Sequence, residues 1–140
     1  MGVAISTGPN VFVDAKIPRR HEKTAPKKTI VAYSDKGESV SGVREVKAED
    51  TDDAELHAVV FAISELKNKF DGFTIVSDHE SIVSEINERK LKSGVKRPVL
   101  LRIINELDTN PTIKVELLAN NPAHRVLNKY LREHPGLKEL

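Results

Sequence analysis

Three acidic side chains lie where carboxylates are expected to carry chemistry. Asp14 follows the apolar residues Val-Phe-Val, Glu55 stands at the start of a helical pattern, and Asp78 directly follows the apolar run 73–77. An acid within an otherwise apolar strand needs a reason, because Asp is depleted from strands. The order of the segments predicts that the strands of Asp14 and Asp78 lie side by side, with the helix of Glu55 above them. The three carboxylates are therefore expected to meet at one edge of a sheet.

Such a cluster favours metal-dependent chemistry. Like charges a few ångströms apart repel, and divalent cations relieve that repulsion. An oxygen-rich donor set suits Mg²⁺ or Mn²⁺. Two such ions about 4 Å apart activate a water and stabilise the leaving oxygen of a phosphodiester. The chain has no cysteine, so thiolate metal sites, disulfides and cysteine nucleophiles are excluded, and any metal must bind carboxylate, histidine or backbone oxygen.

Each acid also has a purely structural interpretation. Glu55 in the first turn of a helix is stabilised by the helix dipole alone. Asp78 could serve only as the N-cap of the helix that follows it. Asp14 is harder to explain in this way. The three positions taken together, in this order of elements, favour a functional site.

Apolar periodicity predicts the elements that position these acids. The expected strands are residues 11–17, 29–34, 39–46, 73–77 and 112–118. The expected helices are residues 53–70, 80–90, 98–108 and 123–133. The order βββαβααβα predicts an α/β fold with a five-stranded mixed sheet, in which a three-strand antiparallel meander precedes parallel strands, flanked by helices.

The 140 residues are expected to form a single domain over residues 11–134, with a short N-terminal extension (1–10) and a C-terminal tail (135–140). No apolar run approaches the ~20 residues that span a bilayer. The first ten residues lack the features of a signal peptide. We therefore expect a cytoplasmic protein without a membrane partner. The net charge of +1 does not by itself indicate a nucleic-acid binder.

Four segments carry a resemblance to a known family. Val-Phe-Val-Asp (11–14) matches a strand that ends in an acid, and Asp-Thr-Asp-Asp-Ala-Glu (50–55) matches Thr-Asn-Asn-x-Ala-Glu in outline. Ile-Val-Ser-Asp (75–78) matches an acid between a short apolar strand and a helix. Asn-Asn-Pro-Ala-His-Arg-Val-Leu (120–127) matches Asn-x-x-Ala-Asp-x-x-Ala, with His124 at the acidic position. Over residues 11–133 the chain thus resembles type 1 ribonuclease H and its archaeal and retroelement relatives.

The resemblance implies a ribonuclease H-like fold and cleavage of the RNA strand of RNA–DNA hybrids with one or two Mg²⁺ or Mn²⁺ ions. Asp14, Glu55 and Asp78 would then bind metal and act in catalysis, together with His124. As a fourth ligand, His124 would prefer Mn²⁺ or Zn²⁺ to Mg²⁺ more than a carboxylate does. As a general acid or base it would transfer a proton during product departure. A surface histidine at a helix start is the structural alternative.

The chain departs from the family pattern around the expected substrate path. Ala15 replaces the glycine that usually follows the first acid. Asp50 and Asp52 replace neutral polar residues beside the expected phosphates, which is electrostatically adverse. The basic helix-and-loop protrusion of some relatives is absent. These departures leave the expected metal chemistry intact but lower the expected affinity for the substrate.

A basic segment, residues 16–28, holds six basic side chains and one acid. It could follow a nucleic-acid backbone, and a solvated loop is the alternative. The absence of nearby aromatic residues argues against base stacking. The candidate nucleic-acid contacts are Lys16, Arg19, Arg20, Lys23 and Lys27.

The remaining histidines have different expected roles. His79 directly follows Asp78 and is a candidate to support the metal ligands without binding metal itself. His57 is expected to pack or to lie on the surface, and His21 and His134 are expected to be solvated.

Three functions remain open from the sequence. The preferred one is a divalent-metal-dependent endonuclease acting on RNA–DNA hybrids. The alternative is a catalytically weak or inactive ribonuclease H-like module that binds nucleic acid or protein, and the third is a related nuclease acting on DNA or structured RNA. Clustered carboxylates without a cation cost stability, so their presence favours an enzyme.

Overall fold

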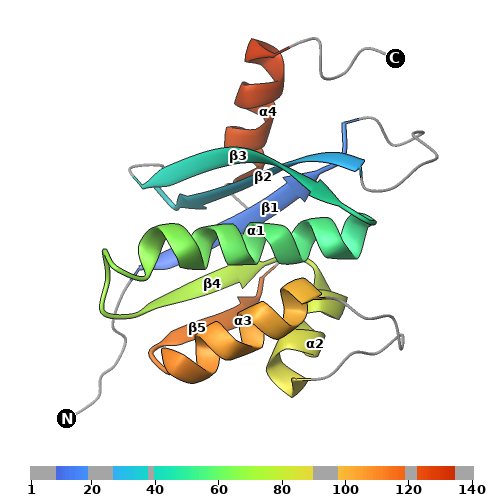
Figure 1. Ribbon diagram of the computed structural model, residues 1–140. Coiled ribbons are helices and arrows are strands. Elements are labelled where there is room, and N and C mark those ends of the chain that lie inside the picture. Colours follow the sequence, from blue (N-terminus) through green and yellow to red (C-terminus); the bar gives the residue numbers. More distant parts are fainter. Residues whose placement is uncertain (1–8, 19–26, 38–39, 90–97, 119–122, 135–140) are drawn as a thin grey trace.

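The computed structural model describes residues 9–18, 27–37, 40–89, 98–118 and 123–134. Within these residues the chain forms one five-stranded sheet with helices on both faces (Figure 1). The strands are β1 (Asn10–Lys16), β2 (Lys27–Asp35), β3 (Ser41–Ala48), β4 (Phe73–Ser77) and β5 (Ile113–Leu117). The helices are α1 (Thr51–Leu66), α2 (Glu80–Glu88), α3 (Pro98–Thr109) and α4 (Ala123–Glu133).

The sheet has the order β3-β2-β1-β4-β5, with β1 at its centre. β1, β2 and β3 pair antiparallel, while β4 pairs parallel with both β1 and β5. The expected fold class, a mixed sheet with a meander followed by parallel strands, is confirmed. Parallel strands end at the same edge of the sheet, so side chains that follow β1 and β4 are brought together.

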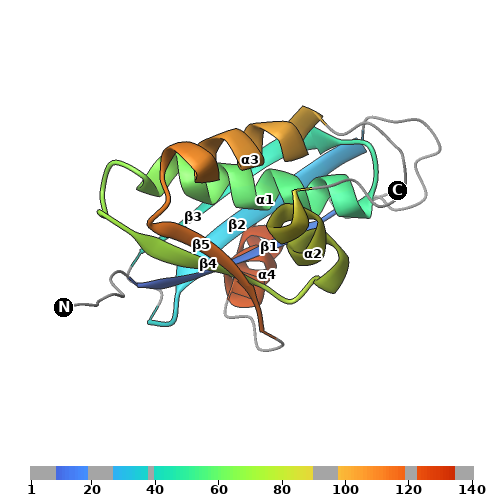
Figure 2. The ribbon, with the colours of Figure 1, turned by 90° about the horizontal axis from the view of Figure 1, so that it is seen from below.

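Two layers of helices enclose the sheet. α1, α2 and α3 cover one face, and α4 lies on the other (Figure 2). The larger core packs Leu56, Val59 and Ile63 of α1 against the sheet, and the smaller core packs Leu127 and Leu131 of α4 against β2. α4 therefore reaches β1 from the side opposite to α1. No helix among the described residues is long and apolar enough to cross a membrane.

One expected boundary was wrong. α1 was expected to continue to residue 70 but ends at Leu66, where the N–H of Lys69 bonds to the Leu66 carbonyl only three residues back and the chain forms a turn. Phe70 preserved the apolar pattern beyond the helix, since its ring packs edge-on against Phe73 at 6.2 Å. The other expected bounds agree with the structure to within two residues. The proposed tail and most of the proposed N-terminal extension lie outside the described residues.

Gly72, between α1 and β4, packs against the segment that leads into β5. A Cβ atom on Gly72 would lie 2.9 Å from the carbonyl oxygen of Thr112, so the backbone would have to move. We expect Gly72→Ala to lower the free energy of unfolding by about 1–3 kcal/mol, the usual cost of overpacking. Urea denaturation measures this change. Gly37→Ala is the matched control, because a Cβ there meets no atom within 4 Å; equal losses in both variants would contradict the interpretation.

Candidate metal centre

Asp14, Glu55 and Asp78 meet just beyond the point where β1 and β4 stop pairing. The last pair in the register is Phe12 with Val76, and two residues further along each strand lie Asp14 and Asp78. Glu55 enters from the N-terminal part of α1, which packs across β1. One carboxylate oxygen from each acid lies within 4.8 Å of the other two. The predicted convergence of the three carboxylates is confirmed.

The electrostatics of this cluster disfavour full ionisation. Asp14 and Glu55 are only 3% and 5% exposed, whereas Asp78 is exposed. Burial, followed by the charges of Asp14 and Asp78, raises the pKa of Glu55 from 4.5 to about 9. Burial is also the main cause that raises the pKa of Asp14, and repulsion from Asp78 acts in the same direction. His124 and the N–H of Ala15 oppose that increase in the pKa of Asp14.

The carboxylate oxygens of the buried Asp14 and Glu55 have few hydrogen-bond donors. Glu55 Oε1 has no hydrogen-bond partner among the described residues. Asp14 Oδ1 accepts a hydrogen bond from the N–H of Ala15 at 2.9 Å, while Asp14 Oδ2 lies against His124 Nδ1 as an ion pair. Buried polar atoms are nearly always satisfied, so an unpartnered one calls for an explanation such as an ion. Three carboxylates with an unpartnered oxygen fit a hard divalent cation.

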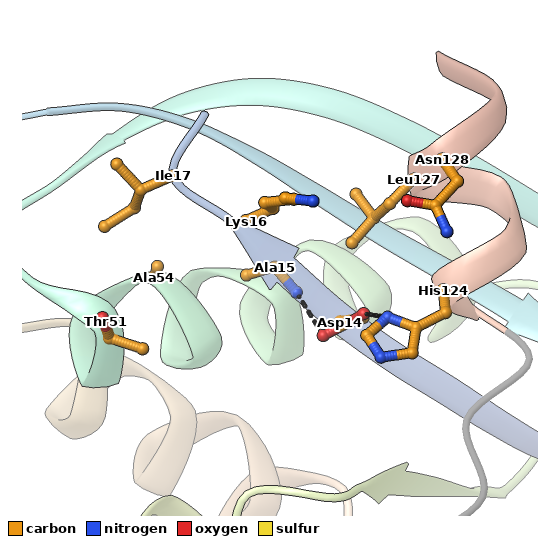
Figure 3. Close-up of a pocket in the computed structure, with 9 residues that line it drawn as sticks. All are labelled: Asp14, Ala15, Lys16, Ile17, Thr51, Ala54, His124, Leu127 and Asn128. Carbon is orange, nitrogen blue, oxygen red and sulfur yellow. Dashed lines mark hydrogen bonds and ion pairs between the residues drawn. The ribbon is translucent and has the colours of Figure 1, made fainter. Parts of the chain in front are cut away.

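His124 approaches the cluster from the opposite face of the sheet. It is the second residue of α4 and contacts Asp14 directly (Figure 3). Among the described residues, the set of ligand atoms that lie within 4.8 Å of one another consists of the three carboxylates alone. His124 therefore stands beside Asp14 and not within that set.

The acidic residues that precede and begin α1 are engaged inside the fold. Asp50 is the N-cap of α1, and its side chain accepts a hydrogen bond from the N–H of Asp53 at 2.8 Å. Asp53 accepts from the N–H of Glu49 at 2.9 Å and lies 3.5 Å from His57 Nε2. Aspartate is a favoured N-cap residue, and negative charge is stabilised at a helix N-terminus. These contacts assign Asp50 and Asp53 a structural role that the resemblance to the family did not suggest.

His79 has an acidic partner of its own. Its Nε2 atom lies 2.9 Å from Asp52 Oδ1. His79 precedes α2 and Asp52 lies in the first turn of α1, so the pair joins two elements next to the cluster. His57 is half-buried against Asp53, and the exposed His134 stacks on Tyr130, in agreement with their expected positions.

A cavity of about 350 Å³ adjoins the cluster between β1, α1 and α4. Asp14 and His124 form one wall, and Lys16, Thr51 and Asn128 supply the other polar groups. Figure 3 shows the Lys16 ammonium extending across the cavity toward α4. Thr51 and Asn128 were not among the residues expected at the site from the sequence. The four-residue spacing from His124 to Asn128, which places both on one face of a helix, was the available signal.

Of the other expected nucleic-acid contacts, Lys27 lies within the described residues. Lys27 begins β2 and lines a separate pocket with Ile17, Asp50 and Thr51. Arg19, Arg20, Lys23 and His21 lie outside the described residues.

Comparison with known proteins assigns the fold. No protein-family model matches the sequence, and no curated protein matches it at a significant level. Solved structures do match. The LC11 ribonuclease H1 in complex with an RNA/DNA hybrid is similar with a TM-score of 0.68 and 14% identity, over 91% of this chain and 99% of that one. LC11 ribonuclease H1 isolated from compost by a metagenomic approach is similar with a TM-score of 0.65 and 12% identity, over 90% of this chain and 93% of that one.

Ribonuclease H1 from the halophilic archaeon Halobacterium salinarum NRC-1 is also similar, with a TM-score of 0.61 and 14% identity, over 89% of this chain and 98% of that one. The chain therefore has a ribonuclease H-like fold. At these identities the likeness concerns the fold alone.

The raised pKa of Glu55 predicts how stability depends on pH. Between about pH 4.5 and about pH 9 the folded chain keeps a proton on Glu55 that the unfolded chain has lost, so stability falls as the pH rises through this window. We expect Glu55→Gln to raise the melting temperature of the metal-free protein at about pH 8, by at least about 4 °C, roughly the shift that 1 kcal/mol gives a domain near this size.

The gain should shrink as the pH falls below about 4, where Glu55 is mostly protonated in the unfolded state as well as in the folded state. Thermal denaturation followed by circular dichroism at several pH values measures it. Glu116→Gln on β5 is the matched control, because Glu116 is exposed. A gain that is equal at all pH values would contradict the electrostatic explanation.

Proposed function

We propose that this chain is a divalent-metal-dependent endonuclease that hydrolyses the RNA strand of RNA–DNA hybrids. One observation carries the proposal: three carboxylates, two of them buried, converge within 4.8 Å at the edge of a ribonuclease H-like sheet. Burial of like charges costs stability unless a cation binds. The hybrid in the crystal structure of the similar LC11 ribonuclease H1 supports the choice of substrate class.

In this proposal Asp14, Glu55 and Asp78 hold one or two Mg²⁺ or Mn²⁺ ions. Bound ions of this kind supply an activated water and stabilise the charge that develops on the phosphodiester. Glu55 must release its proton when it becomes a ligand, because its pKa is raised to about 9. Metal affinity should therefore increase with pH.

His124 and the cavity residues would act on the substrate. The contact with Asp14 holds the imidazole of His124 next to the cluster, where it could transfer a proton or bind metal. Lys16 faces the cavity beside Asp14 and is suited to a phosphate oxygen, and Asn128 and Thr51 add hydrogen-bonding groups. Lys27, with Arg19, Arg20 and Lys23, would extend the contact along the backbone.

A second candidate function is a ribonuclease H-like module that binds nucleic acid or protein without cleaving. The ion pair between His124 and Asp14 favours it, because this pair gives Asp14 a partner in the absence of any metal. Ala15 next to Asp14 supports the same alternative, since it replaces the glycine of the resemblance.

Cleavage assays separate the two functions. We expect the wild-type chain to cut the RNA strand of a labelled hybrid in Mg²⁺ or Mn²⁺, and Asp14→Asn or Asp78→Asn to reduce the rate on the order of 1,000-fold, because metal-ion catalysis supplies several kcal/mol. Both substitutions keep side-chain size and remove the charge that holds the cation. Asp71→Asn is the control, since Asp71 is exposed in the turn before β4.

DNA duplex and single-stranded RNA are tested in parallel to define the substrate. Cuts in one of these and not in the hybrid would identify a nuclease of another specificity. Hybrid binding without cleavage in either metal, unaffected by Asp14→Asn and Asp78→Asn, would contradict the enzyme and establish the binding module.

The preference of the activity for Mn²⁺ or Mg²⁺ tests whether His124 is a metal ligand. If His124 binds metal, activity should be higher in Mn²⁺ than in Mg²⁺, and His124→Asp should shift the ratio of initial rates toward Mg²⁺, because carboxylate is the harder donor. Asn128→Asp is the control, since it adds the same charge one helical turn away on α4. A ratio that His124→Asp leaves unchanged, or that both variants shift equally, would exclude a ligand role and leave proton transfer.

A further inference from the structure

The ion pair between Asp52 and His79 connects two of the segments that carry the metal ligands. Asp52 Oδ1 and His79 Nε2 are 2.9 Å apart, and both side chains are partly shielded from solvent. The two residues are 27 positions apart in the sequence. Because Asp52 lies in the first turn of α1 and His79 directly precedes α2, the pair spans the gap between these helices.

His79 does not use its ring to cap its own helix. It occupies the N-cap position of α2 in an extended conformation, with no hydrogen bond from its side chain to the helix. Its N–H donates to the hydroxyl of the fully buried Ser77 at 3.0 Å. The short segment from Ser77 to His79 is therefore held at one end by β4 and at the other end by Asp52.

Both members of the pair adjoin a carboxylate of the cluster. Asp52 and Glu55 are three residues apart on α1, so they lie on the same face of the helix. Asp78 directly precedes His79, and its carboxylate belongs to the cluster with Asp14 and Glu55. A contact that holds His79 therefore also restrains the backbone of Asp78.

We propose that Asp52 and His79 form a clasp that positions Asp78 against Glu55 for divalent-cation binding. The proposal rests on the proposed function, because it assumes that these carboxylates bind metal. Asp52 and His79 act through their neighbours and do not themselves bind the cation. Partners of this kind that orient metal ligands typically change metal affinity by about 10- to 100-fold when they are removed.

A purely electrostatic role makes different predictions. As isolated charges, Asp52 would attract a cation and a charged His79 would repel it. Asp52→Ala and Asp52→Asn would then weaken metal binding equally, and His79→Ala would leave it unchanged or strengthen it. A clasp predicts that His79→Ala weakens binding. It also predicts that Asp52→Asn retains binding, because the amide keeps a hydrogen bond to the imidazole whichever of its nitrogens carries the proton.

The experiment measures Mn²⁺ affinity by isothermal titration calorimetry at one pH without nucleic acid. We expect affinities about 10-fold weaker in Asp52→Ala and in His79→Ala, at the lower end of the range for such partners. Asp52→Asn should remain within about twofold of wild type if geometry dominates. The double variant Asp52→Ala/His79→Ala should be no weaker than either single variant, because each removes the whole clasp.

Lys67→Ala is the matched control. It breaks an ion pair of equal length, 2.9 Å between Lys67 Nζ and Glu106 Oε2, which joins the opposite end of α1 to α3. We expect its melting temperature to fall about as much as that of His79→Ala while its Mn²⁺ affinity stays at the wild-type value. A general loss of stability would instead weaken Mn²⁺ binding in both.

Equal losses of Mn²⁺ affinity in Asp52→Ala and Asp52→Asn, or unchanged affinity in His79→Ala, would overturn the clasp. Because the measurement contains no substrate, a wild-type protein that binds Mn²⁺ but does not cut hybrids overturns only the proposed endonuclease, and the affinities of the variants still test the clasp. A wild-type protein that binds no Mn²⁺ overturns both.

Discussion

Repulsion among three converging carboxylates is the constraint on which the rest of this structure depends. Asp14 and Glu55 are buried, and Glu55 keeps an oxygen without a donor among the described residues. Burial of such groups is tolerated only where the surrounding fold is rigid enough to hold them. β1 provides this rigidity, since it lies at the centre of the sheet with β2 on one side and β4 on the other.

The elements around the cluster offset part of the free-energy cost of burying these carboxylates, through a helix dipole and histidine partners. Asp52 and Asp53 lie in the first turn of α1, where the helix N-terminus stabilises negative charge. Three aspartates are each paired with a histidine. Asp53 pairs with His57 of α1, Asp52 pairs with His79 before α2, and Asp14 pairs with His124 of α4. These contacts tie the acidic residues at the start of α1 and in β1 into the fold.

Much of the fold was predictable because its patterns are local. Alternating and helical apolar spacing located the strands and helices, and their order defined the mixed sheet. Asp14 within one apolar strand and Asp78 directly after another predicted their meeting, because these two strands lie side by side in the sheet. The error at the end of α1 had a local cause as well, since Phe70 keeps the apolar pattern after the hydrogen-bonded helix has stopped.

The sequence by itself thus determined the type and order of the elements and the three carboxylates that converge, since these depend on spacing along the chain. Only the tertiary structure decided which partners those residues have. Asp52 reaches His79 and Asp14 meets His124 across long stretches of chain, and Asn128 faces the cavity because α4 packs on the face of the sheet opposite to α1. The face on which a helix packs is set by the whole core, and spacing in a single chain does not contain it.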